Sequence, residues 1–369
     1  MAIQIKIRRD TKAEWDSADP VLLAGELGFE LKDSATSGRF KIGNGSREWS
    51  RLPFWYAYQD SAGAYGSSGG GAAAIAWGGD RGLSAGAWIE LNTIEYFDIT
   101  TPGNGADFGD LTVGRAGFAA VSDATYGVFL GGRYNTTPYE LNTIDYVTIA
   151  STSNATDFGD LTSAKNYNAG ASDATYGLSA GGFDDSLADE TNVIDYVTIA
   201  SPGNATDFGD MTSARRFHAG TNDATRGLFG GGRNASNVNQ NVIEYVTIAS
   251  PGNAIDFGDL SSAAFYCSAT SDATYGVFAL GYVSAVDNTL EYVVTQTTGN
   301  ATDFGDLTIA RNHGAFSSNG TYGVFAGGYT TAETNVIDYI TIASPSNATD
   351  FGDLITAAYR NAGTSGSPS

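Results

Sequence analysis

Aromatic and arginine side chains recur at one point of a repeated pattern in this chain of 369 residues. They follow paired glycines, in loops that also carry Asn and Asp. Aromatic rings stack on the C–H faces of sugars, and polar side chains bind sugar hydroxyl groups. The pattern therefore predicts a glycan-binding surface. Its candidate residues are Trp88, Arg133, Tyr134, Tyr139, Phe183, Arg233, Tyr282 and Tyr329.

Few residues suit catalysis or metal binding. A single cysteine, Cys267, excludes an intrachain disulfide, and two histidines, His218 and His313, disfavour a histidine-rich metal site. Both Cys267 and His218 are interpreted as core residues. We expect no catalytic site, no cofactor and no metal. One alternative stays open, because a glycosidase needs only two carboxylates. The third variable loop offers Asp184, Asp185, Asp189 and Glu190.

Composition limits the partners. Asp and Glu number 41 against 19 Lys and Arg, a formal net charge of −22, which disfavours phosphate-led nucleic-acid binding. No apolar stretch approaches the roughly 20 residues of a membrane helix, and the N-terminus lacks the apolar core of a signal peptide. We expect no nucleic-acid partner and no membrane insertion.

The elements that position these residues come from an internal repeat. The octet NATDFGDL, or a close variant, occurs six times, at intervals of 47 to 50 residues. This period matches propeller blades. The octet phenylalanines are Phe108, Phe158, Phe208, Phe257, Phe304 and Phe351.

One period is predicted to form four strands. After the third octet these are strand a (215–221), strand b (227–232), strand c (241–249) and strand d (256–260). Strand c is apolar on both faces, as expected for a strand buried between two other blades. The octet Phe and the Tyr of each strand c are predicted to pack between blades.

The two ends of the array complement each other. The first unit is predicted to open at strand b, at 74–79, and the last octet is followed by an unpaired strand a. We therefore expect Ala357–Ser365 to complete the blade formed by Ala74–Leu111 and to close a ring of six blades. A closed ring leaves no long free edge. The predicted fold is mainly β, a six-bladed kelch-like β-propeller after a small α+β N-terminal domain.

Variation between the six copies falls on one side of the predicted disc. The a–b turns and c–d loops, which share one face, hardly change, whereas the b–c loops differ in length and content. In the first blade, the predicted b–c loop spans residues 80–91. Five of the six residues after strand b are Arg, Phe or Tyr, and the sixth is Asp80. The b–c face is the predicted binding surface; unrestrained drift of the loops is the alternative.

Most acidic residues follow the repeat. Acids of the octets, the strand-c positions and the a–b turns are interpreted as turn caps, with Ca²⁺ binding as an alternative. One cationic position recurs in four blades, and we expect it to form a buried salt bridge with an octet Asp. Its residues are Arg115, Lys165, Arg215 and Arg311, and the other two blades have Ala264 and Ala358.

Charge also separates a first domain from the array. Residues 1–57 have a net charge of +1, residues 58–369 have −23, and residues 58–73 read as a Gly/Ser-rich linker. A strand is expected around Ile3–Arg8 and short strands at Glu30–Leu31 and Arg39–Ile42. The capping box Thr11-Lys12-Ala13-Glu14 predicts a short helix between them. The predicted domains are 1–57, the linker 58–73 and the propeller 74–369.

The repeat and the N-terminal segment each resemble a known family. Strand b ending in Gly-Gly, followed by an acid-Tyr pair such as Asp145-Tyr146, resembles the kelch repeat, although Phe stands where kelch repeats have Trp. The stretches IQIKIRRDTKAEW, PVLLAGELGFE, GRFKIGNG and EWSRLPF resemble the N-terminal domain of the phage major tropism determinant and of many phage tail fibres. This resemblance implies a virion protein and a homotrimer.

We therefore predict a non-catalytic tail-fibre or adhesin subunit. Residues 1–57 would attach it to other virion tail or baseplate proteins, and the propeller would bind a receptor, expected to be a glycan, on the bacterial surface. The predicted location is the virion tail, after assembly in the host cytoplasm. A purely structural baseplate or decoration protein and a surface-glycan hydrolase are the alternatives.

Overall fold

The computed structural model divides into two compact units, residues 1–73 and 74–369. It describes residues 78–88, 91–137, 139–184 and 186–368 with their side chains, and six earlier strands by their backbone alone. The fold of each unit is described separately below.

The first unit contains a four-stranded sheet in the order β1-β2-β3-β4. The pairing β1–β2 is parallel and the other two are antiparallel. A short pair, β5–β6, follows within the predicted linker. The helix predicted after Thr11 and residues 3–6 of the predicted first strand lie outside the described residues. The strands are β1 (Ile7–Thr11), β2 (Leu27–Leu31), β3 (Arg39–Ile42), β4 (Trp55–Tyr56), β5 (Tyr58–Gln59) and β6 (Tyr65–Gly66).

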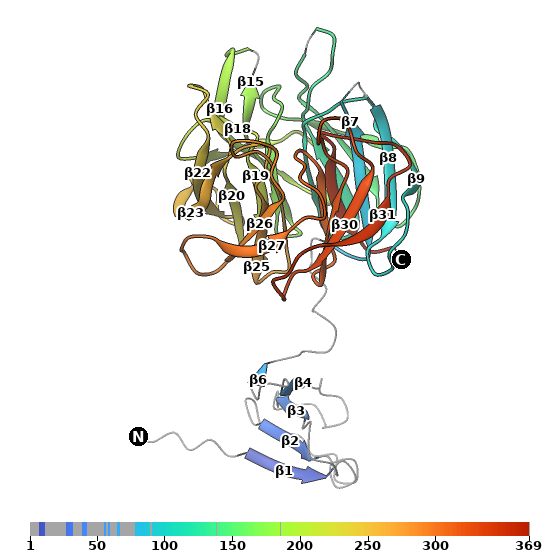
Figure 1. The fold of residues 1–369 in the computed structure, drawn as a ribbon, viewed down its shortest axis with the longest axis vertical. Helices are drawn as coiled ribbons and strands as arrows, with labels where there is room; N and C mark the ends of the chain where they lie inside the picture. The colour runs from blue at the N-terminus through green and yellow to red at the C-terminus, as the bar shows by residue number, and fades with distance from the viewer. Residues whose placement is uncertain are drawn as a thin grey trace. The chain divides into compact units, whose positions relative to one another are not determined.

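The second unit is a propeller of six four-stranded antiparallel sheets (Figure 1). Its described residues contain no helix, and hence none that could span a membrane. From strand a to strand d, blades 1 to 3 are β32 (Ala362–Gly366), β7 (Arg81–Ala87), β8 (Leu91–Asp98), β9 (Ala106–Asp110); β10 (Ala119–Ser122), β11 (Tyr126–Leu130), β12 (Thr143–Thr148), β13 (Thr156–Asp160); and β14 (Ala169–Ser172), β15 (Tyr176–Asp184), β16 (Asp189–Thr198), β17 (Thr206–Asp210).

Blades 4 to 6 repeat this plan, and blade 4 carries an extra short pair, β18 (Arg215–Arg216) with β21 (Arg233–Asn234). The innermost strands surround a central channel. The remaining strands are β19 (Ala219–Asn222), β20 (Arg226–Gly230), β22 (Gln240–Thr247), β23 (Ile255–Ala264); β24 (Ser268–Ser271), β25 (Tyr275–Ala279), β26 (Thr289–Val294), β27 (Thr302–Asp306); and β28 (Ala315–Ser318), β29 (Tyr322–Ala326), β30 (Val336–Thr341), β31 (Thr349–Asp353).

The C-terminal strand closes the ring, as predicted. β32 pairs antiparallel with β7, and Ala362 lies opposite Ala85. The predicted position of the first strand b is wrong, however: it is β7, at Arg81–Ala87, and not 74–79. The glycine pair Gly78-Gly79 therefore precedes this strand, and most of the segment taken for the first b–c loop is the strand itself.

Aromatic pairs fill the contacts between blades, which confirms their predicted role. In every blade the strand-c Tyr meets the octet Phe edge to face, with ring centroids 5.7 to 6.1 Å apart. The surrounding apolar clusters combine residues of two blades; Phe158 of blade 2 packs in one cluster with Val197 and Ile199 of blade 3. Burial of one blade face therefore depends on the next blade.

The octets also link neighbouring blades directly. The backbone N–H of Asp110 donates to Oδ1 of Asn154 in the next blade, at 3.1 Å, and the Ala155 N–H donates back to the Asp110 carbonyl, at 2.7 Å. The Asn bond recurs at all six junctions, at 3.1 to 3.2 Å. Gly109 has φ 146°, and a Cβ there would collide with the Ser153 carbonyl. The Asn and the FGD of the octet, which are the same in all six copies, form this six-fold contact.

The four recurring cations form buried salt bridges, but not with the predicted partner. Each pairs with the strand-c acid of its own blade rather than with an octet Asp, so these acids are ion-pair partners and not turn caps. All eight side chains are fully buried. The pairs are Arg115–Asp145 (3.0 Å), Lys165–Asp195 (3.0 Å), Arg215–Glu244 (2.6 Å) and Arg311–Asp338 (2.9 Å).

The two blades without the cation use glutamate. Glu95 accepts the backbone N–H groups of Ile355 and Thr356, and Glu291 accepts from Ser261. Burial raises the pKa of Glu95, and the two backbone hydrogen bonds oppose that rise. Equivalent backbone donors also bind the strand-c acid where the cation is present, as the Thr112 N–H binds Asp145, so the Glu of blades 1 and 5 keeps these donors without a charge partner.

Candidate functional site

The b–c face surrounds one mouth of the central channel. One residue from each d–a connection lines this mouth, and each has a left-handed backbone, with φ between 55° and 63°. We call these six residues the mouth ring: Gly117, Tyr167, Phe217, Tyr266, His313 and Arg360.

Backbone hydrogen bonds hold the mouth ring together. The N–H of Gly117 donates to the Arg360 carbonyl (2.8 Å), and that of Tyr167 donates to the Gly117 carbonyl (2.6 Å). Equivalent bonds lead around the mouth through Phe217 and His313. In blade 5 the Cys267 N–H, and not that of Tyr266, donates to the Phe217 carbonyl. The mouth side chains thus rest on a fixed backbone scaffold.

Stacked rings occupy the mouth. The centroids of Tyr266 and His313 lie 3.7 Å apart, those of Tyr167 and Phe217 4.3 Å, and those of Phe217 and Tyr266 4.5 Å. Arg360 completes the group, because its Nη1 donates to the Tyr167 hydroxyl at 2.5 Å. Burial and the charge of Arg360 hold the pKa of His313 well below its usual range, so this imidazole is neutral at pH 7.

A second set of residues lies just outside the mouth ring. In five blades a residue of this set forms a backbone bridge with the residue that comes just before the mouth-ring residue in the sequence, as Arg133 does with Ala116. In blade 1 the Trp88 N–H donates to the Tyr359 carbonyl. Trp88, and not Asp80, therefore occupies the position after strand b. The corrected set is entirely aromatic or Arg: Trp88, Arg133, Phe183, Arg233, Tyr282 and Tyr329.

All eight predicted site residues lie on the b–c face. Tyr139 is 41% exposed, and the other seven are half-buried. The burial comes from neighbouring rings: Tyr329 lies 5.1 Å from Tyr359, and Tyr282 lies 5.0 Å from Phe265. These aromatics thus pack on the d–a connections and keep one side toward solvent.

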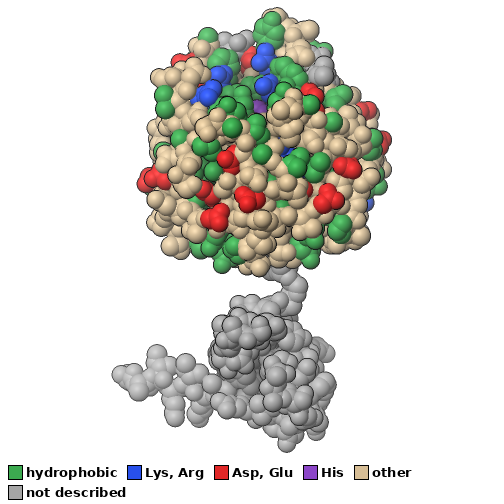
Figure 2. Space-filling model, in the orientation of Figure 1, with side chains coloured by type: hydrophobic (Ala, Val, Ile, Leu, Met, Phe, Trp, Pro, Cys, Tyr) green, Lys and Arg blue, Asp and Glu red, His purple; other side chains and the backbone are tan. Residues whose placement is uncertain are grey.

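Basic charge gathers on this face. Ten Lys and Arg residues lie in the propeller, four are sealed in the buried salt bridges, and Arg81 and Arg226 donate to backbone carbonyls on the a–b side. The remaining four belong to the b–c face: Arg133, Arg216, Arg233 and Arg360. Figure 2 shows blue side chains gathered around a histidine at the upper end of the propeller, with acidic side chains scattered elsewhere.

Two carboxylates of the third b–c loop are already engaged. Asp184 is buried and accepts hydrogen bonds from the backbone N–H and hydroxyl of Ser186. Glu190 lies 3.1 Å from Arg216. Asp189 is exposed, and Asp185 lies outside the described residues. Burial and the neighbouring Asp189 carboxylate raise the pKa of Glu190, and Arg216 opposes that rise. Among the described residues of this loop, Asp189 and Glu190 are the two carboxylates that lie side by side.

The a–b turns behave as predicted for turn caps. Oδ1 of Asp123 accepts the N–H groups of Thr125 and Tyr126, and the same geometry recurs at Asp173, Asp223, Asp272 and Asn319. The described residues include no group of three or more side chains arranged to hold a metal ion.

Inside the channel, His218 and Cys267 occupy equivalent strand-a positions and are buried, in line with their interpretation as core residues. They line a cavity of about 80 Å³ beneath the mouth ring. Burial raises the pKa of Cys267 to about 12 and holds that of His218 well below its usual range. Neither group is poised as a nucleophile or base at neutral pH.

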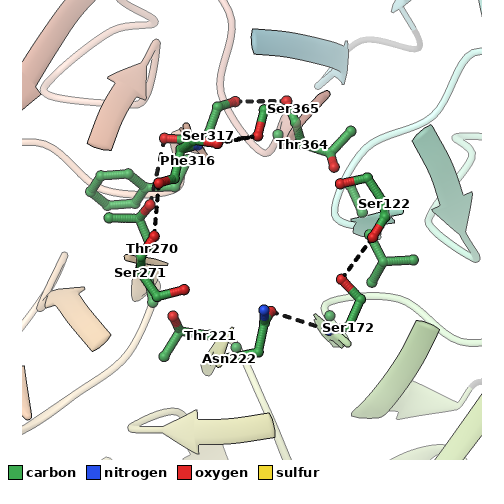
Figure 3. A pocket seen from close by; sticks show the side chains of 17 residues that line it. Ser122, Ser172, Thr221, Asn222, Thr270, Ser271, Phe316, Ser317, Thr364 and Ser365 are labelled. Carbon is green, nitrogen blue, oxygen red and sulfur yellow. Dashed lines mark hydrogen bonds between the residues drawn. The ribbon is translucent and has the colours of Figure 1, made fainter. Parts of the chain in front are cut away.

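The opposite mouth of the channel is neutral (Figure 3). Its hydroxyl and amide groups bond from blade to blade; Ser172 Oγ donates to the Ser122 carbonyl at 3.1 Å, and Ser318 Oγ donates to that of Ser271 at 2.7 Å. One equivalent position supplies Ser122, Ser172, Asn222, Ser271, Ser318 and Ser365.

Sequence reasoning missed the mouth ring and the arginines Arg216 and Arg360. Both arginines lie in d–a connections, which the analysis of b–c loops did not cover. A position-by-position comparison of the six copies would have found them, because one position reads Gly, Tyr, Phe, Tyr, His and Arg, always two residues before the Ala or Ser that begins strand a.

Comparison with known proteins adds a domain identification. A search of curated proteins found no match to the chain. Residues 5–47 match the family model described as the major tropism determinant N-terminal domain. This chain therefore joins a domain similar to that of the phage major tropism determinant to a six-bladed β-propeller.

Proposed function

We propose that this protein is a non-catalytic receptor-binding subunit of a phage tail, a virion component that binds the host surface through the b–c face. The main observation in support is a difference between two parts of the propeller. The octets and a–b turns repeat from blade to blade, whereas the b–c face differs in every blade and carries arginine and aromatic side chains. Rigid scaffolds with variable loops on one face are typical of binding proteins.

Both ends of the propeller contact a–b turns. Asp80 precedes β7 and binds the a–b turn residue Asn319, and Ser367 donates to the a–b turn carbonyl of Ala124. The chain thus enters and leaves the propeller on the a–b side. Residues 1–57 would attach the protein to other tail or baseplate proteins.

A bacterial surface glycan is the proposed receptor class. Trp88, Tyr139 and Tyr329 offer ring surfaces beside Asn and Arg side chains, the combination that suits sugars. One such site binds weakly. Assembly as a homotrimer through residues 1–57 would raise avidity by roughly 10²–10⁴ where three receptors can be spanned.

Adsorption of the purified protein to host cells tests this proposal. The wild type should bind cells and block phage adsorption, and Tyr134→Ala/Phe183→Ala/Tyr329→Ala should lose both effects while its melting temperature stays close to that of the wild type. Ile255→Ala/Val294→Ala removes exposed side chains beside the c–d loops and is the matched control. Normal binding by the triple variant, or loss in the control, would reject the b–c face; a folded wild type that never binds cells favours a structural virion protein.

A further inference from the structure

The arginines of the b–c face are held by aromatic rings, and this arrangement restricts how they can bind a ligand. The Arg360 guanidinium carbon lies 4.3 Å from the Trp88 ring centroid, and that of Arg133 lies 5.5 Å from the same ring. Arg233 stacks on Phe265 at 3.8 Å. Stacking fixes the plane of a guanidinium and leaves its N–H edge available for a planar anion.

Several polar atoms at the mouth have no hydrogen-bond partner among the described residues. They are Nε of Arg360, Nε of Arg133 and Nε2 of His313, and all three are shielded from solvent. A buried donor without a partner is costly, and native structures seldom keep one without a reason. A ligand at the mouth would give the two arginine Nε–H groups an acceptor.

The charge around the mouth is positive even though the propeller is acidic. Among the charges that act on the Tyr266 hydroxyl are Arg360, Arg233 and Arg216, and together they oppose the rise that burial causes in its pKa. Glu190 neutralises Arg216. The other described acids of this face, Glu140, Asp184, Asp189, Asp287 and Glu333, lie in or beside b–c loops outside the mouth ring. Glu140 accepts from Asn166, Asp184 from Ser186 and Asp287 from the Thr289 N–H.

From these contacts we propose that Arg360, flanked by Arg133 and Arg233, binds a negatively charged group carried on a sugar of the receptor, seated over the channel mouth. The proposal rests on the proposed function and names the chemical class of its ligand. Arginine binds carboxylate and phosphate through paired hydrogen bonds, and rings such as Trp88, Tyr139 and Tyr359 contact the sugar. Hydroxyl groups of an uncharged glycan accept hydrogen bonds from arginine but leave the guanidinium charge without a counter-ion.

Titration calorimetry on the full chain tests the ligand class. The probes are an oligogalacturonate for the carboxylate, glucose 6-phosphate for the phosphate, and maltotetraose as the neutral sugar. At least one charged probe should bind tenfold or more tightly than maltotetraose, and its affinity should fall as salt is raised from 50 to 500 mM. The better of the two charged probes identifies the anionic group.

Variants assign the binding to the mouth. Arg360→Gln should weaken the charged probe at least tenfold, Arg360→Lys should weaken it less, and Arg226→Gln should leave it unchanged. Arg226 is the matched control, because it also stacks on a tyrosine, at 4.5 Å from Tyr245, but on the a–b side. Equal affinity for charged and neutral probes, or an unchanged affinity in Arg360→Gln that is folded by circular dichroism, would overturn the proposal.

Adsorption to host cells distinguishes a failure of the anionic-ligand proposal from a failure of the receptor function on which it rests. If the wild type adsorbs to cells and the alanine variant at Tyr134, Phe183 and Tyr329 does not, the receptor function stands. Arg360→Gln and Arg133→Gln should then also lose adsorption. Full adsorption by both arginine variants, with no calorimetric binding of either charged probe, would reject the anionic ligand and leave the receptor function intact.

Discussion

The two mouths of the central channel are built by the same six inner strands, yet they differ in chemistry. At the a–b mouth, one position is Ser in five blades and Asn in one, and these side chains bond from blade to blade. At the b–c mouth, the equivalent position is Gly, Tyr, Phe, Tyr, His and Arg. The uniform residues at the a–b mouth link the blades to one another, and the varied residues at the b–c mouth give each blade a different side chain there.

This contrast divides the propeller into parts that maintain the fold and a part available for recognition. Changes to the closing strand, the buried ion pairs, the channel core or the octets should lower stability and leave ligand specificity unchanged. Changes at the b–c mouth should do the reverse. Four measurements on the stabilising parts test this division, in order of decreasing effect.

Deletion of residues 362–369 should have the largest effect. It removes β32 and leaves β7 as an unpaired edge, so we expect insoluble protein or the loss of a cooperative melting transition. Deletion of 368–369 alone retains β32 and serves as the control. A soluble 1–361 fragment with an unchanged melting temperature would show that ring closure does not stabilise the fold.

Breaking one buried ion pair should be the next most damaging change. Arg311→Ala leaves Asp338 buried without its cation and should lower the free energy of unfolding by about 3–5 kcal/mol. Chemical denaturation measures this loss.

The double variant Arg311→Ala/Asp338→Glu provides a matched comparison. It recreates the Ala-and-Glu combination that blades 1 and 5 use, and it should regain part of the lost stability. If the double variant is less stable than the single one, the glutamate does not substitute for the ion pair in the way we infer.

Acidification should destabilise the propeller through its buried histidines. Burial lowers the folded-state pKa of His218 and His313 well below 6.5. The unfolded chain therefore takes up protons first as the pH falls below about 6.5, and each histidine costs up to about 1.4 kcal/mol per pH unit. The stabilisation is complete above that pH and is lost below it.

His218→Asn tests this pH dependence, because Asn168 and Asn361 occupy the equivalent position in two other blades. Between pH 7.5 and 5 its stability, measured by denaturation, should fall less steeply than that of the wild type. Parallel curves would mean that His218 does not titrate on unfolding in this range.

Loss of one octet contact should have the smallest effect. Asn154→Ala removes a single inter-blade hydrogen bond and should cost about 1 kcal/mol, with ligand binding unchanged. Asn154→Asp keeps an acceptor oxygen and should be less destabilised in the same denaturation experiment. If Asn154→Ala lost cell adsorption without losing stability, the octets would take part in recognition, which contradicts the division between stabilising parts and the b–c mouth.

Periodicity made most of the fold predictable. The octet spacing, the double-sided apolar strand c and the incomplete ends led to six blades and a closing strand, and the pairing of Ala362 with Ala85 agrees with this. Strand b of the first blade was missed because RGLSAGA lacks the aromatic and β-branched residues of YGVFLGG.

The site was less predictable, for a physical reason. Spacing shows that a cation recurs in four blades and two kinds of acid in all six, but it does not show which acid lies within reach. At Arg115 the structure selects Asp145 of strand c. The mouth ring depends on left-handed residues such as Tyr167 and Arg360. Nothing in the local sequence of a Tyr or an Arg indicates that backbone conformation.

The pairing of β32 with β7 also means that β7 is synthesised long before its partner strand. The ribosome needs roughly 15 to 55 s to add the residues between Ala87 and Ala362, at about 5–20 residues per second. During that interval β7 waits with an open edge. A strand rich in Gly, Ala and Ser is a poor template for adhesion to other nascent chains, so the weak strand character of Arg81–Ala87 suits the element that must wait longest for its partner.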